Sequence, residues 1–582
     1  MVASESRLCG QRVFYVQEHD SHKNSDKTLF PKGTKLDSAG IVVKSQASLQ
    51  HYKLKGYALA AVDSFDFKED TCKIWWYSGE KYEFGLIKMD DDTRELIKSA
   101  GLNKYNWNAK NPDSNAVSSF LIDVVNYLVN NGFPFAKAYF KDIVFDKNKV
   151  NLRLEIDKGR YFTYDTLEIT GNLRLSKNYL HRYLRLIPGN SYRHADVQNS
   201  TKLLRNLPFA QSKSEPIISF VNDVAIVNLK LDANNASRFD FIIGILPGTS
   251  SIGGRGFLLT GELMADLQNK FGVGERISVF FRRLEVEDQE IKLGFSYPYL
   301  FHTSFGADFS FDLRRNRGLS VDINTMVGGQ YIIDGNSLLR IFWNLRSGRL
   351  TKIDTARLVQ TKRLPPNLDY NYSGGGLELV RQNYDYRFNP SKGWELNLNV
   401  GAGVRSIIKN NGILSINAEN VDFSALYDSI NLNTLQLNAV LSGTLFIPIS
   451  NRITFKNNIQ GGVRFDQGKA LENEIFRIGG NRLLRGFDEL SIFTNLYAIY
   501  TAELRLLIDR NSYLSLPFID IARMRVLAEG QTLWDNALGV GMGLNFATQI
   551  GIFNISFAAG KRLDNPINFQ DTKVHFGYVN LF

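Results

Sequence analysis

The chain has 582 residues, enough for several domains, and its 44% hydrophobic content, 14 Pro and 2 Cys exclude a disordered chain and a disulfide scaffold. Its 69 Lys and Arg against 59 Asp and Glu give a formal charge of +10, but no dense basic block or RNP-like motif accompanies it, so we predict no nucleic acid partner. No apolar run reaches the roughly eighteen residues that a transmembrane helix requires, whereas the alternating strands of a membrane β-barrel would escape this test.

The first forty residues give no structural prediction. Their opening stretch, MVASESRLCGQRVFYVQEHD, has no apolar core, so we expect no signal peptide within this chain, and we expect no amphipathic helix in residues 1–40. Cys9 and Cys72 lie far apart without CxxC spacing, which favours unpaired thiols.

Residues 82–158 alternate between strand and helix patterns. A strand, YEFGLIKM, precedes a short helix, DDTRELIKSAG, and a longer helix, SNAVSSFLIDVVNYLVNNG, in which Phe120, Val124 and Leu128 form one apolar stripe that stops at Gly132. Two strands, AYFKDIVF and KVNLRLEI, then form a hairpin at DKNK.

The same β-α-α-β-β order recurs at residues 161–232, in YDTLEIT, SKNYLHRYLR, HADVQNSTKLLRN, SEPIISFV and VAIVNLKL. Such a repeat buries a helix pair on a three-stranded sheet. Upstream, residues 48–84 are similar to the second half of this unit. We therefore predict four segments: 1–78 with a partial unit, 79–159, 160–234, and a different region at 235–582.

These repeats resemble POTRA domains. The resemblance rests on a helix–Gly–aromatic turn, matched by Gly132 with Phe133, and on a junction matched by Gly159 with Tyr161. Each unit leaves a sheet edge that would accept an extended client segment by β-augmentation, or that serves only as a blunted edge of a spacer.

After residue 235 the helix patterns disappear and period-two alternation begins. In EIKLGFSY, Ile291, Leu293 and Phe295 share one face, and Lys292 shares the other with Gly and Ser. FGADFSF and GWELNLNV behave alike. Residues 237–582 exceed an ordinary β-sandwich, so we predict an all-β transmembrane β-barrel of about sixteen antiparallel strands behind the α+β POTRA repeats.

The chain ends in KVHFGYVNLF, which alternates and finishes on an aromatic residue. This segment resembles the C-terminal β-signal of bacterial outer-membrane proteins, with Phe576, Tyr578 and Phe582 as its aromatic positions. Asn580 departs from an all-apolar outer face.

The stretch GGNRLLRGF is similar to the V/I-R-G-F/Y signature of the BamA/TamA/two-partner-secretion superfamily. Arg485, Gly486 and Phe487 match, and Leu484 is a mild departure. In that family the sixth extracellular loop folds back into the barrel lumen, and Gly486 would permit its tight tip.

The resemblance also implies a partner for Arg485. The family's F-x-D-x-G motif is matched in PFIDIAR by Phe518 and Asp520, with Ala522 in place of the Gly, and YTAELRLLI adds Glu503 as a neighbour. A lumen Arg that pairs bidentately with a carboxylate would pin the loop. Asp466 in RFDQG is a rival partner, and a solvent-facing Arg is the alternative to any pair.

Two further segments extend the resemblance to residues from about 80 to 582. LQNKFGVGERISVFFRR with LGFSYPYLF is similar to the family's opening barrel hairpin, and YDYRFNPSKGWELNLNV to its mid-barrel NP-x-x-G segment. Five glycines near the closing strands would favour a labile seam or serve barrel curvature; they are Gly539, Gly541, Gly543, Gly551 and Gly560.

The resemblance implies an outer-membrane assembly factor that receives clients through POTRA domains in the periplasm and promotes folding and insertion of β-barrels. The implied partners are unfolded outer-membrane client proteins, accessory lipoproteins and outer-membrane lipid. The alternatives are a dedicated two-partner-type secretion transporter for one partner protein and a simple diffusion pore.

An enzyme is not predicted, and neither a cofactor nor a metal site is expected. The seven His show no HExxH spacing and no G-x-S-x-G elbow occurs; the His are at 19, 22, 51, 181, 194, 302 and 575.

Overall fold

The structure is a computed structural model that describes residues 13–579 with internal gaps. The gaps are 22–27, 32, 106–113, 235, 248–256, 286–287, 317–318, 335–336, 387–388, 417–421, 468–470, 472–473, 482, 529–530, 549–550, 563–566 and 568. The chain forms two compact units. Unit 1 is Met1–Asp165, Pro188–Ala195 and Ser219–Ile226, and unit 2 is Thr166–Ile187, Asp196–Ile218 and Val227–Phe582.

The first module of unit 1 is a four-stranded sheet with one helix. Its elements are β1 (Val13–Asp20), β2 (Lys35–Asp37), α1 (Ser38–Leu54), β3 (Ala61–Lys68) and β4 (Thr71–Tyr77), in the sheet order β2-β1-β4-β3. Alternate residues of β4 point into the core, where Cys72, Ile74 and Trp76 are fully buried. Cys72 is a free thiol, as expected, and Cys9 lies outside the described residues.

The second module follows the predicted order. It contains β5 (Glu83–Lys88), α2 (Asp91–Ser99), η1 (Leu102–Lys104), α3 (Ser114–Val129), β6 (Lys137–Asp146) and β7 (Lys149–Asp157), with sheet order β5-β7-β6. The predicted stripe of α3 is buried, because Phe120, Val124 and Leu128 are each at most 1% exposed. Gly132 ends this segment with a left-handed φ of +95°.

The third module repeats the pattern with one addition. It contains β8 (Thr163–Thr170), α4 (Lys177–Leu184), α5 (His194–Asn206), β10 (Ile217–Val221) and β11 (Val224–Ala233), as predicted, and the unpredicted short strand β9 (Ala210–Ser212). The sheet order is β10-β11-β8, with β9 paired to β11. The strand is too short to produce a period-two signal in the sequence.

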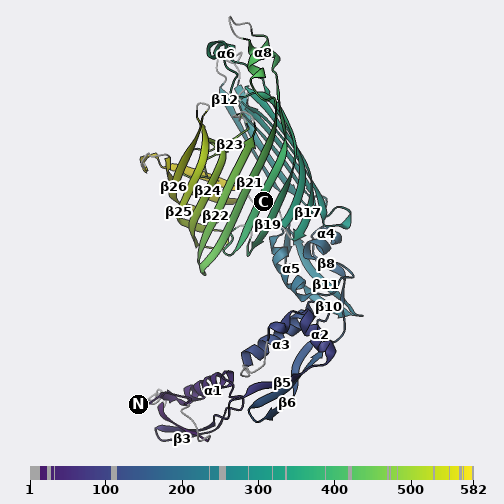
Figure 1. The fold of residues 1–582 in the computed structure, drawn as a ribbon, viewed down its shortest axis with the longest axis vertical. Coiled ribbons are helices and arrows are strands. Elements are labelled where there is room, and N and C mark those ends of the chain that lie inside the picture. The colour runs from purple at the N-terminus through teal and green to yellow at the C-terminus, as the bar shows by residue number, and fades with distance from the viewer. Residues whose placement is uncertain are drawn as a thin grey trace, which may run out of the picture. The chain divides into compact units, whose positions relative to one another are not determined.

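In the described part of the chain, seventeen strands form one sheet in chain order, and the pairs are antiparallel. Figure 1 shows this sheet. Without the three-residue β23, sixteen strands remain, which is the predicted number. The strands are β12 (Arg238–Pro247), β13 (Phe257–Gln268), β14 (Arg276–Glu285), β15 (Asp288–Tyr297), β16 (Phe305–Asn316), β17 (Ser320–Asp334), β18 (Ser337–Leu350), β19 (Asp369–Tyr384), β20 (Gly393–Ile408), β21 (Asn433–Ser450), β22 (Ile453–Asp466), β23 (Phe476–Ile478), β24 (Ile492–Leu507), β25 (Tyr513–Ala528), β26 (Gln531–Thr548), β27 (Gly551–Arg562) and β28 (Lys573–Val579).

The barrel strands are apolar on the outer face and polar on the inner face. On β20, Trp394, Leu398 and Val400 are 40%, 37% and 45% exposed, whereas Arg405 on the opposite face is fully buried. Among the described residues, no hydrogen-bonded pairing joins the terminal strands β12 and β28. In the part of the chain that the structure describes, none of the helices is long and apolar enough to cross a membrane.

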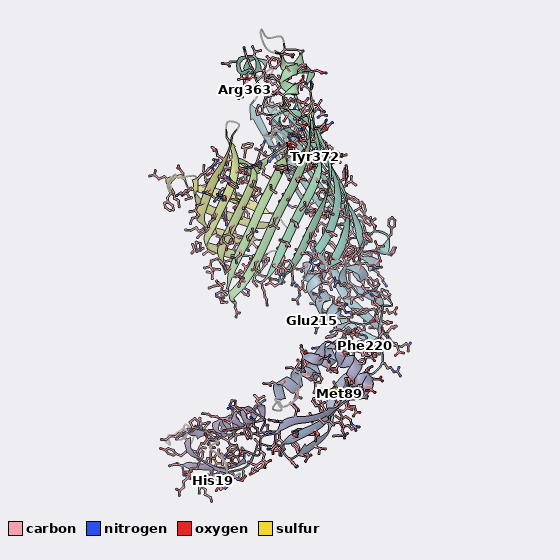
Figure 2. All side chains as sticks on the ribbon, viewed as in Figure 1. His19, Met89, Glu215, Phe220, Arg363 and Tyr372 are labelled. Carbon is pink, nitrogen blue, oxygen red and sulfur yellow. The ribbon has the colours of Figure 1, made fainter. Side chains whose placement is uncertain are left out.

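One end of the barrel carries an apolar cap that the sequence analysis missed. Three short helices lie there: α6 (Thr355–Thr361), α7 (Asn411–Leu414) and α8 (Phe423–Asp428). Figure 1 shows α6 and α8 at this end of the sheet, and Figure 2 labels Tyr372 and Arg363 there. The prediction that helices stop after residue 235 was wrong, because these helices have only four to seven residues and no periodic stripe. We call the buried cluster the far cap; it consists of Leu358, Leu368, Tyr370, Tyr372, Ile407, Ile413, Phe423, Tyr427 and Leu471.

At the opposite end, the α4 side of the third module packs on the barrel turns. The ring of Tyr179 meets that of Tyr299 edge-on at 5.2 Å, and Ser176 N–H donates to Gly272 O at 2.7 Å. Burial raises the pKa of the Tyr179 hydroxyl well above its usual range, so the group stays neutral in this contact. Arg185 Nη2 donates to Ile333 O at 2.8 Å. Within unit 2, this module and the barrel therefore share a buried junction.

Candidate functional site

The segment between β22 and β24, residues 467–491, carries the RGF sequence, and its described residues contact inward-facing side chains of the barrel. We call it the lumen loop. Gly480 and Leu484 exchange backbone hydrogen bonds of 3.0 and 3.2 Å, which closes a narrow tip before Arg485. Leu484 is fully buried in an apolar cluster that also contains Ile478, Ala522 and Met524. The two departures from the family signature, Leu484 and Ala522, thus belong to one packed cluster.

Arg485 pairs with Asp520 through a two-pronged contact. Nη2 donates to Asp520 Oδ1 at 2.7 Å, and Nε donates to Oδ2 at 2.8 Å. The backbone N–H of Arg485 donates to the same Oδ2 at 3.0 Å. Asp520 lies on β25 and its side chain is 1% exposed, against 13% for Arg485. This geometry fixes both the direction of the side chain and the backbone beside it.

Further charged groups surround the pair. Glu503 on β24 accepts from Arg485 Nη1 at 3.3 Å and from Arg505 Nε at 2.8 Å, and Lys456 Nζ lies 3.7 Å away. The guanidinium carbon of Arg485 stands 3.4 Å from the centroid of the Phe518 ring. Lys456 and Arg505 were not predicted from the sequence. Their inward phase on β22 and β24 was the available signal, since Lys456 is directly opposite Glu503.

The backbone of the lumen loop rests on bare glycine in the barrel wall. A Cβ on Gly539 would lie 2.1 Å from Arg485 O, and one on Gly560 would lie 2.4 Å from Gly486 O. Gly486 itself has a φ of +89°, and its Cβ would lie 2.8 Å from the backbone of Ala559. The close approach of the loop is therefore a physical reason for glycine at 539 and 560. From the sequence, these glycines were interpreted only as favouring a labile seam or as serving barrel curvature.

The loop also contacts the last two strands. Asn481 Nδ2 donates to Asn554 Oδ1 at 3.1 Å, and Asn481 Oδ1 accepts from Ser556 Oγ at 3.1 Å. Gly486 N–H donates to His575 Nε2 at 3.3 Å. Lys573 on β28 forms a 2.9 Å ion pair with Asp488. Phe487 packs at the edge of the Leu484 cluster.

The remaining predicted residues fall elsewhere. Asp466, the rival partner of Arg485, lies 3.0 Å from Arg405 instead. Phe576 points outward from β28 and is 65% exposed, and Tyr578 is in register with Phe553. Asn580 and Phe582 lie outside the described residues. Among the His, Cys, Asp and Glu of the described segments, no group of three or more could hold a metal ion.

Comparisons with known proteins agree with this architecture. The Omp85 superfamily domain matches residues 269–580, and the POTRA family, described as a surface antigen variable number repeat, matches residues 162–234. The outer membrane protein assembly factor BamA of Neisseria meningitidis serogroup B (strain ATCC BAA-335 / MC58) is 22% identical over 258 residues. That match covers 43% of this chain and 30% of the relative, so the chain spans less than a third of that protein's length.

Two solved structures share the fold. CdiB from Acinetobacter baumannii has a TM-score of 0.51 at 12% identity, and the match covers 86% of this chain and 90% of the CdiB chain. CdiB from Escherichia coli has a TM-score of 0.50 at 14% identity, and the match covers 94% of this chain and 98% of the CdiB chain. Because the superfamily domain matches more than half of the sequence, the chain belongs to the Omp85 superfamily.

Proposed function

We propose that the protein is an outer-membrane assembly factor that receives unfolded clients through periplasmic POTRA domains and promotes the insertion of β-barrels. The observation that carries the proposal is a loop held against the last strand of the barrel. No described pairing joins β12 to β28, while Gly486 and Asp488 contact His575 and Lys573 on β28. Outer-membrane lipid surrounds the apolar outer face, and accessory lipoproteins would bind the POTRA domains.

A strand at the edge of a sheet is a template for another strand, because its backbone N–H and C=O groups would accept the backbone of a client strand by β-augmentation. In this proposal β28 offers that edge. The lumen loop holds β28 from the inside through its contacts with His575 and Lys573. Val574 and Phe576, which are 62% and 65% exposed, keep an apolar face toward lipid at the same place.

The POTRA sheets offer a second strand edge. β6 is the edge strand of the sheet β5-β7-β6, and it exposes Tyr139, Ile143, Val144 and Phe145 by 41%, 55%, 54% and 40%. An exposed apolar edge of this kind suits an extended and partly hydrophobic client segment. The sequence-based hypothesis of β-augmentation is therefore best assigned to β6.

The second candidate is a dedicated transporter that exports one partner protein through the lumen. The buried network of Arg485, Glu503 and Asp520 favours it in one respect, because a loop fixed inside the barrel would close a transport path until it moved. In that case the loop acts as a gate, and the strand edge at β28 has no role.

Depletion in the native cell separates the two. As the protein level falls, every outer-membrane protein is quantified, with wild-type protein supplied in trans as the control. We expect a broad loss of β-barrel proteins. Loss of one exported protein with the other barrels intact would instead establish the dedicated transporter and reject the assembly role.

A further inference from the structure

A second buried ion cluster holds the lumen loop, eleven residues before Arg485. Arg405 on β20 is fully buried, and its Nη1 lies 2.9 Å from Glu474 Oε2 and 3.0 Å from Asp466 Oδ2. Gln436 on β21 donates to Asp466 at 3.2 Å and to Glu474 at 3.3 Å. Glu474 belongs to the loop, whereas the other three side chains come from consecutive barrel strands. The wall thus encloses one carboxylate of the loop.

Described residues near Glu474 are buried as well. Leu471 is 1% exposed inside the far cap, and Ile475 is 8% exposed. The Phe476 ring stands 5.3 Å from the Tyr497 ring and 5.0 Å from the guanidinium carbon of Arg464. Leu471 of the loop therefore belongs to the far cap, whereas Arg485, later in the loop, belongs to the Asp520 network.

Removal of Arg405 and removal of Glu474 should affect the cluster differently, because each removal leaves different charges behind. Glu474 and Asp466 are 2% and 6% exposed, and the guanidinium of Arg405 lies between them. Without that guanidinium, two nearly dehydrated carboxylates would face one another and repel. Asp466 is fixed in β22, so the loop residue Glu474 would be the one to move. Without Glu474, in contrast, Arg405 retains Asp466.

We propose that Arg405 is a positioning residue of the lumen loop. The cluster of Arg405, Asp466 and Glu474 is a second anchor, which holds the first half of the loop independently of the Arg485–Asp520 pair. It sets the path along which the loop enters the barrel and joins that path to the far cap. The inference rests on the proposed function only for its consequence in the cell, because the position of the loop is measured directly.

The test labels single cysteines on the full chain in lipid vesicles, in a Cys9→Ser, Cys72→Ala background. Ile475→Cys reports the first half of the loop and Leu484→Cys reports the tip; both positions are buried in the parent. Arg405→Gln should raise the rate of maleimide labelling at 475 at least about tenfold and leave 484 protected, since the Asp520 pair remains. Arg485→Gln should raise the labelling rate at 484 and leave 475 protected. Protection of 475 in Arg405→Gln would overturn the proposal.

Two further variants test the charge argument. Arg405→Lys keeps a positive charge and should restore most of the protection at 475. Asp466→Asn added to Arg405→Gln removes the repulsion and should also restore it; failure of both would reduce Arg405 to a packing residue. Barrel folding is followed by heat-dependent mobility on gels. If Arg405→Gln does not fold, the Glu474→Ala variant tests the proposal in its place. This variant changes only the loop, and it must raise the rate of maleimide labelling of Ile475→Cys.

The cellular readout stays separate. In one outcome, position 475 becomes accessible in Arg405→Gln while outer-membrane protein levels do not change. This result would support Arg405 as a positioning residue and reject the proposed role of the loop in assembly. If labelling does not change, the anchor fails whatever the cells show.

Discussion

Gly560 of β27 lies directly against the backbone of Gly486 at the tip of the lumen loop. A Cβ built on Gly560 would sit 2.4 Å from Gly486 O, and one built on Gly486 would sit 2.8 Å from Gly560 N. Backbone atoms on both sides leave neither residue a flexible neighbour that can give way. The barrel wall and the loop can therefore pack this closely because both residues are glycines.

Gly560→Ala should lift the loop tip from the wall. The added methyl needs a shift of about an ångström, which we expect to weaken the Arg485–Asp520 contact and raise the labelling of Leu484→Cys several-fold, at a cost of about 1–3 kcal/mol. Gly329→Ala on β17 is the matched control, since a Cβ there meets nothing within 4 Å. Equal labelling in the two variants would contradict the close contact between wall and loop.

Arg485→Ala should detach the tip without unfolding the barrel. It leaves Asp520 and Glu503, which are 1% and 3% exposed, with fewer compensating charges, a loss of about 3–5 kcal/mol. The strand ladder contains no hydrogen bond from this side chain, so barrel mobility on gels should be unchanged, whereas client insertion should fall. Arg485→Lys keeps the charge but loses the fork and should give an intermediate result. If Arg485→Ala inserts clients at the wild-type rate, the contact between Arg485 and Asp520 is not required for insertion.

Much of the barrel and part of the site follow from local sequence patterns. Alternation placed Trp394 and Leu398 on one face because side chains of a strand point to opposite sides. The resemblance to the family's motifs implied the pair of Arg485 and Asp520, with Asp466 as a rival partner, and in the structure Arg485 contacts Asp520.

Other features depend on register and three-dimensional contact. Arg405 stands sixty-nine residues from Glu474 along the chain, so no local spacing links them. The glycine at 560 looks like any other glycine of a strand until the loop lies on it. The far-cap helices are shorter than two turns and are stabilised by the cluster around Tyr427, not by a periodic stripe of their own.

The junction between the third module and the barrel should depend on one glycine. A Cβ on Gly274 would enter the Tyr179 ring at 2.1 Å, and Gly274 has a φ of +79°. Gly272 has nearly the same φ of +76°, but its Cβ would lie 3.4 Å from the nearest atom. Gly272→Ala therefore reports backbone strain alone, and Gly274→Ala reports strain plus displacement of Tyr179.

Spin-label distances between α4 and the turn at Tyr299 measure this effect. We expect a broadened distribution in Gly274→Ala and a parental one in Gly272→Ala. Tyr179→Ala combined with Gly274→Ala removes the clash but also the ring contact, so the distribution should stay broad. A narrow parental distribution in Gly274→Ala would show that Tyr179 does not hold the junction.

The β6 edge makes the last prediction, and it concerns client capture. Val144 is 54% exposed on this edge strand, so Val144→Lys should change the free energy of unfolding by less than about 0.5 kcal/mol. A charge on the edge nevertheless opposes the approach of another strand, as in natural sheets that avoid aggregation. Photo-crosslinking from position 139 to a client peptide should therefore fall several-fold.

Ile122→Lys is the matched control, since it places the same charge at a 57% exposed position on α3, away from the strand edge. Crosslinking should be unchanged in this variant. An equal loss in both would mean that the client is attracted or repelled by charge over the whole module, and that β6 does not receive it as a strand.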